Sequence, residues 1–176
     1  MIVIGNGAQE CVIRRSIVRR AGVGIQFSAG GTGWVEDCVI ESARVGGIDM
    51  SYGSAIVRRC RIGVTEQSLG GAQGRLEVYD SILEGGTYAT INSTTTIIVR
   101  NSHILNAGGL SVKGLVSAPN EYLDLRENWW GTSDASQIAS WIDDQYGTVT
   151  WQPIQLGPVP TESTSIGELK ASFGID

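Results

Sequence analysis

The sequence has little charge, few prolines and few aromatic residues for its length. Charged residues make up 18% and aromatic residues 7% of the 176 residues, and 4 prolines stand against 24 glycines. This composition excludes a disordered chain and a long charged helix, and it is typical of a fold with many tight turns. The formal net charge of -5 also disfavours nucleic acid and anionic membrane surfaces as partners.

Targeting and metal-binding motifs are missing as well. No apolar run approaches the roughly 18 residues of a membrane span, and the N-terminus lacks the basic and long apolar regions of a signal peptide. We therefore expect either synthesis in the cytosol or a sequence that begins inside a longer secreted or cell-surface protein. The three cysteines, Cys11, Cys38 and Cys60, show no Cys-x-x-Cys spacing. They predict buried free thiols, with no metal site and no cofactor.

One block recurs along the chain, with the order apolar, polar, polar, small, any residue, apolar. The small residue stands at positions 16, 38, 60, 81, 102 and 128, at steps of 22, 22, 21, 21 and 26 residues. Such a step is too short for a two-helix repeat, which needs about 33 residues. A leucine-rich repeat has a suitable length, but these blocks hold Val, Ile, Cys and Ser in period-two alternation instead of leucines at fixed offsets. The pattern predicts an all-β, single-stranded parallel β-helix of about six coils.

Period-two alternation also predicts which side chains face inward. One apolar column comes from the blocks: Ile13, Val35, Val57, Val78, Val99 and Leu125. A second set stands upstream of the blocks: Ile25 and Phe27, Ile48 and Met50, Ala89 and Ile91, Leu110 and Val112. Three short strands per coil follow, and like residues of adjacent coils should stack about 4.8 Å apart.

The C-terminal end of the solenoid carries a predicted cap. Asp134 and Gln137 form a helix N-terminal signature, and Gly147 is the expected stop. The apolar residues of this cap are Ile138, Trp141 and Ile142 on the helix, with Trp129, Trp130 and Trp151 over the core. We expect a solenoid with its cap at 1–152, a linker at 153–164, and a short helix at 165–176 that docks on the solenoid.

No capping helix is predicted at the N-terminal end, because residues 2–4 already have the pattern of a strand. An uncovered coil exposes unpaired backbone groups and an apolar cross-section. We expect truncation from a longer protein. End-to-end association through the N-terminal coil, or a cap of another type, is the alternative.

The repeat resembles the right-handed parallel β-helix family, which includes pectate lyases, polygalacturonases, phage tailspikes and many uncharacterised secreted bacterial proteins. The resemblance covers roughly residues 2–132. Residues 127–132, Glu-Asn-Trp-Trp-Gly-Thr, resemble the end of the last coil in the uncharacterised members. The chain departs from the family at a tight turn where the family favours asparagine. The residues at this turn are Arg15, Asp37, Arg59, Asp80, Asn101 and Glu127.

The resemblance implies a ligand groove along the outward face of one sheet. The predicted outward residues there are polar: Gln26, Ser28, Asp49, Ser51, Thr90, Asn92, Ser111 and Lys113. Glycoside hydrolysis needs two carboxyls about 5 to 9.5 Å apart, and Asp49 is alone on this stripe. A calcium-dependent lyase needs several carboxylates and a base. Lys113 is three coils, or about 14 Å, from Asp49.

The turn positions offer a second pair of candidate catalytic carboxylates. Asp37 and Asp80 stand two coils apart, at about 9.6 Å, which matches an inverting pair. Arg59 lies between them, so a structural ladder of alternating charges is the favoured interpretation, and catalysis is the alternative.

The remaining reactive residue types have structural interpretations. His103, the only histidine, is predicted to face outward beside no acid or nucleophile. Cys38 and Cys60 occupy the same inward position on successive coils. They predict a stacked pair of buried thiols, with a strained disulfide as the alternative.

The favoured function is a non-catalytic module of a secreted or surface protein that presents a rigid face for carbohydrate or protein binding. The alternative is a polysaccharide lyase or glycoside hydrolase, or a fragment of one, that acts on a surface or plant polysaccharide. A structural spacer is the third hypothesis. The number of carboxylates on the groove separates the first two, because the fold alone does not determine function.

Overall fold

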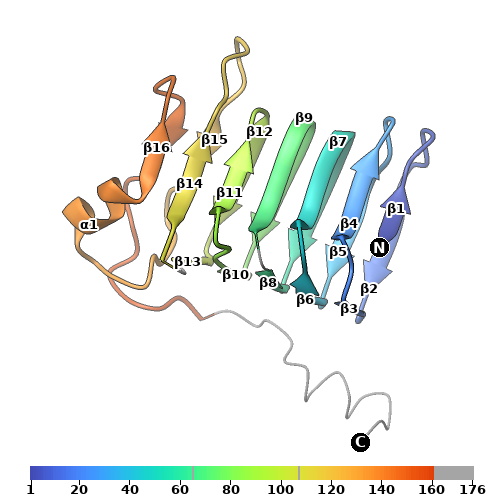
Figure 1. The fold of residues 1–176 in the computed structure, drawn as a ribbon, viewed down its shortest axis with the longest axis horizontal. Helices are drawn as coiled ribbons and strands as arrows, with labels where there is room; N and C mark the ends of the chain where they lie inside the picture. The colour runs from blue at the N-terminus through green and yellow to red at the C-terminus, as the bar shows by residue number, and fades with distance from the viewer. Residues whose placement is uncertain (65, 107, 161–176) are drawn as a thin grey trace, which may run out of the picture.

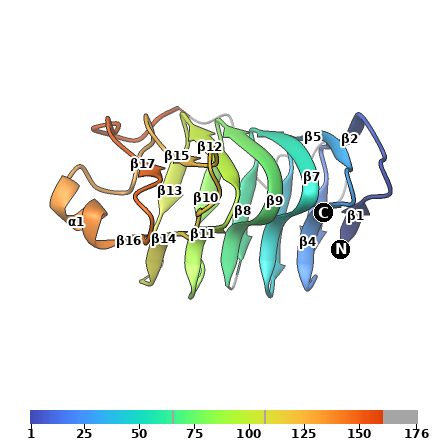
Figure 2. The same cartoon turned by 90° about the horizontal axis from the view of Figure 1, so that it is seen from above.

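The chain forms a parallel β-solenoid whose coils lie side by side along one axis (Figure 1). The computed structural model describes residues 1–64, 66–106 and 108–160. The helix predicted at 165–176 and the last part of the predicted linker lie outside these residues. Figure 2 shows the coils from above, with the only helix of the described residues beyond the last full coil.

Three faces run along the solenoid. The first face contains β1 (Ile2–Ile4), β4 (Val23–Ser28), the start of β7 (Gly46–Arg58), the start of β9 (Gln67–Tyr79), β11 (Ala89–Ser93), β14 (Leu110–Gly114) and β16 (Ile142–Asp144). The second face contains β2 (Cys11–Arg14), β5 (Thr32–Glu36), the ends of β7 and β9, β12 (Thr96–Arg100), β15 (Leu123–Asp124) and β17 (Val149–Thr150). The third face contains β3 (Ile17–Arg19), β6 (Val39–Ala43), β8 (Arg61–Val64), β10 (Ile82–Glu84) and β13 (His103–Leu105).

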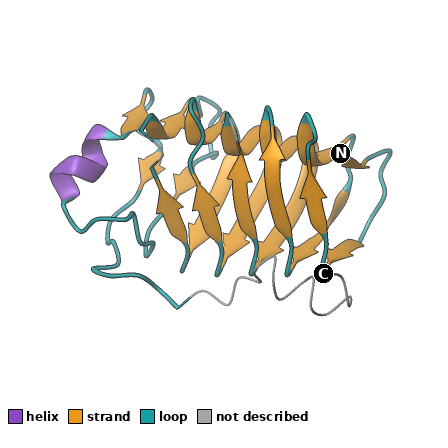
Figure 3. Ribbon diagram, turned by 60° about the horizontal axis from the view of Figure 1, so that its bottom comes forward, coloured by secondary structure: helices purple, strands orange, loops and turns teal. Residues whose placement is uncertain are grey.

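Parallel strand pairing places similar residues of successive coils next to one another. Ile25, Ile48, Leu69 and Ile91 are successive parallel partners on the first face, and each is 0% exposed. Because β7 and β9 run through the first face into the second, these two faces form one continuous sheet, and the third face forms a separate five-stranded sheet (Figure 3). The predicted parallel β-helix is confirmed, and seven strands line the first face.

The core follows the predicted inward columns with two exceptions. Val35, Val57, Val78, Val99 and Leu125 are fully buried. Ile13 is only partly buried because no described coil covers its N-terminal side. Leu110 is also only partly buried, whereas Val112 in the same strand is fully buried.

A tight turn leads from the second face to the third in successive coils. The residue at this turn has positive φ in all six blocks: Arg15 (46°), Asp37 (53°), Arg59 (49°), Asp80 (50°), Asn101 (50°) and Glu127 (62°). A left-handed conformation costs an L-residue about 1–2 kcal/mol relative to its preferred conformations. Five of the six residues are not asparagine, so other interactions must hold the turn.

The small residue directly after the turn supplies these interactions. Ser102 Oγ accepts a hydrogen bond from the Ser81 amide at 3.0 Å and donates one to the Arg100 carbonyl at 2.8 Å. Ser81 Oγ accepts from the Cys60 amide at 3.1 Å in the same way. In the last block Asn128 Oδ1 accepts from the Ser102 amide at 2.9 Å. We call the column of Ser16, Cys38, Cys60, Ser81, Ser102 and Asn128 the inner ladder.

The C-terminal cap contains the predicted helix, which is shorter than expected. The helix α1 spans Ala135–Ser140, and the Asp134 side chain caps it by accepting hydrogen bonds from two backbone amides. Ile142 was predicted on the helix, but it begins β16 and pairs with Val112. Sheet pairing with the last coil thus ends the helix, and Gly147, with φ of 68°, lies in the turn before β17 instead of at the helix stop.

The tryptophans near the cap have different roles. Trp130 is fully buried and packs edge-on against Trp151, with ring centroids 6.5 Å apart. Trp129 was predicted to cover the core, but it continues the third face in a bridge with His103. Residues 153–155 follow the last coil, because the Pro153 carbonyl accepts from the Glu127 amide at 2.7 Å.

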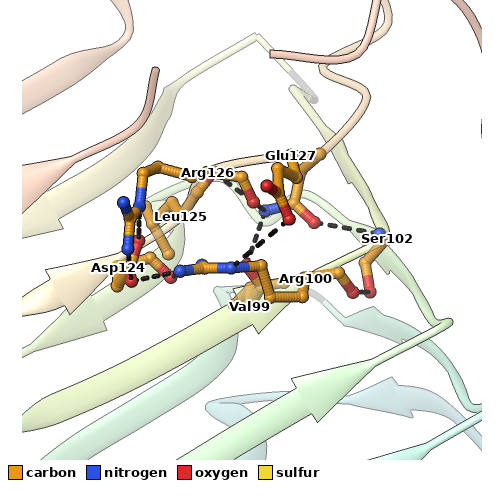
Figure 4. Close-up of polar contacts among 8 residues, drawn as sticks. Val99, Arg100, Ser102, Asp124, Leu125, Arg126 and Glu127 are labelled. Atoms are coloured by element: carbon orange, nitrogen blue, oxygen red, sulfur yellow. Dashed lines mark hydrogen bonds and ion pairs between the residues drawn. The ribbon is translucent and has the colours of Figure 1, made fainter. Parts of the chain in front are cut away.

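An arginine–aspartate network ties the last two coils together (Figure 4). Arg126 donates two hydrogen bonds to the Asp124 carboxylate, at 2.8 and 2.7 Å. Arg100 forms an ion pair with the same carboxylate and donates to the Asp124 carbonyl at 2.9 Å. Burial alone would raise the pKa of Asp124, but the hydrogen bonds from Arg126 and Arg100 outweigh it and lower the pKa to about 2.

The inner ladder predicts the effect of a single hydroxyl deletion. Ser102→Ala leaves the buried Ser81 amide without its acceptor, so we expect a loss of about 1–3 kcal/mol of unfolding free energy. Urea unfolding monitored by circular dichroism measures this loss. Ser133→Ala, at an exposed position, is the matched control and should change stability by less than about 0.5 kcal/mol. Equal effects of the two substitutions would contradict a stabilising role for the ladder.

The Asp124 network predicts a pH dependence of stability. The folded-state pKa of Asp124 is about 2, below the unfolded value of about 3.9, so the network stabilises the protein above pH 4 and is lost as the pH falls toward 2. Asp124→Asn should cost about 1–2 kcal/mol at pH 7, because the network is partly exposed. The stability gap between wild type and variant should close from pH 4 to pH 2 in urea titrations. A constant gap would show that ionisation of Asp124 is not responsible.

Candidate functional site

A polar stripe runs along the outward face of the first sheet. Its members are in register on consecutive strands: Gln26, Asp49, Gly70, Asn92, Lys113 and Asp143. We call this column the first-face stripe. Four of its members were predicted from the sequence. Asp143 was missed, because it comes from the cap segment that lies beyond the repeated blocks.

At the N-terminal part of the stripe, the polar side chains form hydrogen bonds with one another. Asp49 Oδ2 accepts hydrogen bonds from Gln26 Nε2 at 3.2 Å and from Ser51 Oγ at 3.1 Å. The predicted residues Gln26, Asp49 and Ser51 are therefore brought together. Their mutual bonds fix the side chains before any ligand arrives, which reduces the entropy lost on binding.

The middle of the stripe contains a gap and an unsatisfied acceptor. Gly70 has no side chain, and a Cβ built there would lie 2.4 Å from Gln67 Nε2. Gln67 Oε1 accepts from Asn92 Nδ2 at 2.9 Å, whereas Asn92 Oδ1 is buried and has no partner within the described residues. The Asn92 amide oxygen is therefore an unpaired acceptor enclosed by its neighbours, and a ligand donor reaches it only when the side chain turns outward. Gln67 was not predicted from the sequence, although it stands two residues before the buried Leu69 of β9, as an alternating strand residue does.

The C-terminal part of the stripe carries a cation beside an aromatic ring. Lys113 Nζ donates to the Tyr88 hydroxyl at 2.5 Å and lies 4.7 Å from the centre of that ring. The hydrogen bond with Tyr88 raises the pKa of Lys113, and the negative charge of Asp143 acts in the same direction. Tyr88 is 47% exposed, so its ring is accessible at the edge of the stripe.

Thr90 and Ser111 do not belong to the outward surface. Both were predicted to face the groove, but each is 0% exposed. Thr90 Oγ1 donates to the Leu105 carbonyl of the third face at 3.1 Å. The chain turns a corner from the third to the first face at this point, so Thr90 is buried together with both of its neighbours, Ala89 and Ile91, and Ser111 is buried together with Val112. Strand alternation therefore fails at the corner.

The carboxylates of Asp37 and Asp80, at the turn positions, accept hydrogen bonds from side chains of the neighbouring coils. Arg59 donates to both oxygens of Asp37, at 2.6 and 3.1 Å. The hydrogen bond from Arg59 lowers the pKa of Asp37, more than burial raises it. Asp80 Oδ1 accepts from Asn101 Nδ2 at 2.5 Å. These contacts agree with the structural ladder of charges that the sequence favours.

A pair of glutamates on the third face was not found from the sequence. Glu41, Gly63 and Glu84 are successive partners in the sheet, which places the two acids about 9.6 Å apart. They line a hollow of about 480 Å³. Each acid is paired with an arginine, Glu41 with Arg19 and Glu84 with Arg61. The signal was available, because each acid stands three residues after a small ladder residue.

Cysteine and histidine side chains serve the packing of the solenoid. Cys11, Cys38 and Cys60 are free thiols, and the last two are fully buried. The contact with Cys38 and burial both raise the pKa of the Cys60 thiol. His103 Nε2 lies 2.9 Å from the Val159 carbonyl, so the predicted outward histidine contacts the C-terminal tail.

The described residues offer neither a metal site nor a membrane-spanning helix. Among residues 1–64, 66–106 and 108–160, no three His, Cys, Asp or Glu side chains are grouped so that they could hold a metal ion. In the same residues no helix has the length and hydropathy needed to cross a membrane.

Comparison with known proteins agrees with the solenoid. The sequence model of the right-handed β-helix region matches residues 1–129. No curated protein matches the chain significantly. No solved structure does so either. Since the family match covers well over half of the 176 residues, the chain belongs to the right-handed β-helix family.

Proposed function

We propose that this chain is a non-catalytic module that binds carbohydrate along the first-face stripe, as part of a secreted or cell-surface protein. The observation that carries the proposal is the register of the stripe. Hydrogen-bonding side chains stand in register on five of the six strands of the stripe, with Gly70 on the remaining one. The strands are about 4.8 Å apart, which is close to the length of one sugar residue in an extended glycan. Each coil except that of Gly70 can then contact one sugar through this column.

The chemistry of the stripe suits sugar hydroxyls. It offers acceptors at Asp49 and Asn92, donors at Gln26 and Lys113, and an exposed aromatic ring at Tyr88. Once the Asn92 side chain turns outward, a sugar hydroxyl that donates to its Oδ1 would satisfy an acceptor that otherwise has no partner in the described chain. Aromatic rings contribute through contact with the apolar face of a sugar ring.

The carboxylates of the stripe do not suit hydrolysis there. Asp49 and Asp143 are four strands apart, at about 19 Å, whereas glycosidases need about 5 to 9.5 Å. Lys113 is adjacent to Asp143, but the multiple carboxylates of a calcium-dependent lyase are missing from the stripe. Binding without cleavage is therefore the function that the stripe supports.

Glycoside hydrolysis on the third face is the second candidate. The spacing of Glu41 and Glu84 across Gly63 matches the upper limit for an inverting pair. Against it, both acids are already engaged by arginines, as in the turn ladder. If this candidate were correct, the wild-type protein would release reducing ends from a polysaccharide, and Glu84→Gln would abolish this release.

A panel of immobilised neutral and acidic polysaccharides tests the proposal. We expect retention of the protein without new reducing or unsaturated ends. Asn92→Ala should weaken binding about tenfold, which corresponds to the loss of a hydrogen bond with a ligand. Gln137→Ala, at an exposed position on α1, is the control and should bind as wild type does. Failure to retain any polysaccharide, or equal binding by both variants, would contradict the proposal, and cleavage would overturn its non-catalytic part.

A further inference from the structure

The second face carries an apolar outward patch that the first-face stripe does not use. Val12, Trp34 and Ile56 are successive partners on β2, β5 and β7, and Glu77 follows them. Trp34 and Ile56 line a hollow of about 330 Å³, whose polar residues include Glu10, Ser54 and Arg75. The hollow spans four coils, a length of about 14 Å. It is long enough for a short oligosaccharide.

Several polar groups in this hollow are available to a ligand. Within the described part of the chain, no hydrogen bond engages the Trp34 indole N–H, the Ser54 hydroxyl or the Glu10 carboxylate. Arg75 and Glu77, in contrast, are paired at 2.7 Å. A ligand would therefore find an apolar floor with donors and acceptors beside it, at positions that the neighbouring strands hold in place.

A second aromatic residue lies next to this hollow. An adjoining hollow of about 250 Å³ shares Thr32 and Ser54 with the first and is lined by Tyr52. Tyr52 is 62% exposed and has a φ of 69°. Ala29, at the same corner of the preceding coil, also has positive φ (49°), so this conformation belongs to the turn, and the turn directs the Tyr52 ring to the surface. Glycine would adopt the same conformation without strain.

The shape and charge of the two hollows favour one class of ligand. A pyranose ring has an apolar face of C–H groups and a rim of hydroxyls, which matches an aromatic floor with polar neighbours. The charges of Arg75 and Glu77 cancel, so Glu10 leaves the site with a formal charge of about -1, which disfavours anionic ligands. We propose that Trp34 and Tyr52 form a second site, which binds a neutral oligosaccharide. The site shares the ligand class of the proposed function but none of its residues.

Calorimetric titration with cellohexaose as the neutral probe tests this inference, with a hexamer of oligogalacturonate as the acidic one. Trp34→Ala should lower the affinity of the second site for cellohexaose at least tenfold, and Trp34→Phe should keep most of it. Gln137→Ala, at an exposed position on α1 and outside both hollows, is the control and should leave affinity unchanged. Tighter binding of the acidic hexamer at this site would overturn the neutral ligand class.

Tyr52→Gly separates a ligand contact from a structural role. It should reduce the affinity for cellohexaose several-fold while the melting temperature stays constant or rises, because the backbone strain is relieved. A lower melting temperature with unchanged affinity would contradict the inference.

Asn92→Ala distinguishes the second site from the first-face stripe. If Asn92→Ala removes all binding and Trp34→Ala none, the second site is wrong and the proposed function stands. If Trp34→Ala removes all binding and Asn92→Ala none, the second site stands and the stripe is wrong. We expect each variant to weaken one of two binding events and to leave the other unchanged.

Discussion

The inner ladder of buried small residues is the interaction on which the solenoid depends. At each turn between the second and third faces, one residue adopts a left-handed conformation, which is unfavourable for most L-residues. The small residue that follows fills the inside of the turn. At Ser81, Ser102 and Asn128 its side chain accepts the amide of the preceding coil. The same bonds therefore hold the turn and join adjacent coils.

This constraint explains why the outer surface is organised in columns. Once each turn is held in the same conformation, the strands of successive coils align, and outward residues stack in register. Gln26, Asp49, Asn92 and Lys113 lie on one such column, and Trp34 and Ile56 lie on another. Since stability comes from contacts between neighbouring coils, the outward positions of a coil can vary without loss of the fold. Ligand sites on the two faces are compatible with this arrangement.

Much of the fold could be predicted from the sequence because the inner ladder leaves a visible repeat. The spacing of Ser, Cys and Asn residues identifies the coils, and alternation identifies inward residues such as Val57 and Val99. The candidate sites were only partly predicted. Thr90 and Ser111 are misplaced by alternation because the chain turns a corner there. The positions of Glu41 and Glu84 follow from the repeat, but the hollows that they and the Trp34–Ile56 column line depend on contacts between coils that local alternation does not describe.

Amide hydrogen exchange measured residue by residue tests the inner ladder most directly. The amides of Cys60, Ser81 and Ser102 donate to buried side chains of the ladder. They should therefore exchange as slowly as the strand amides of Val57 and Val99, which open only with the coil itself. Exchange of these three amides at the rate of exposed loops, while the strand amides remain protected, would show that the ladder does not hold the coils together.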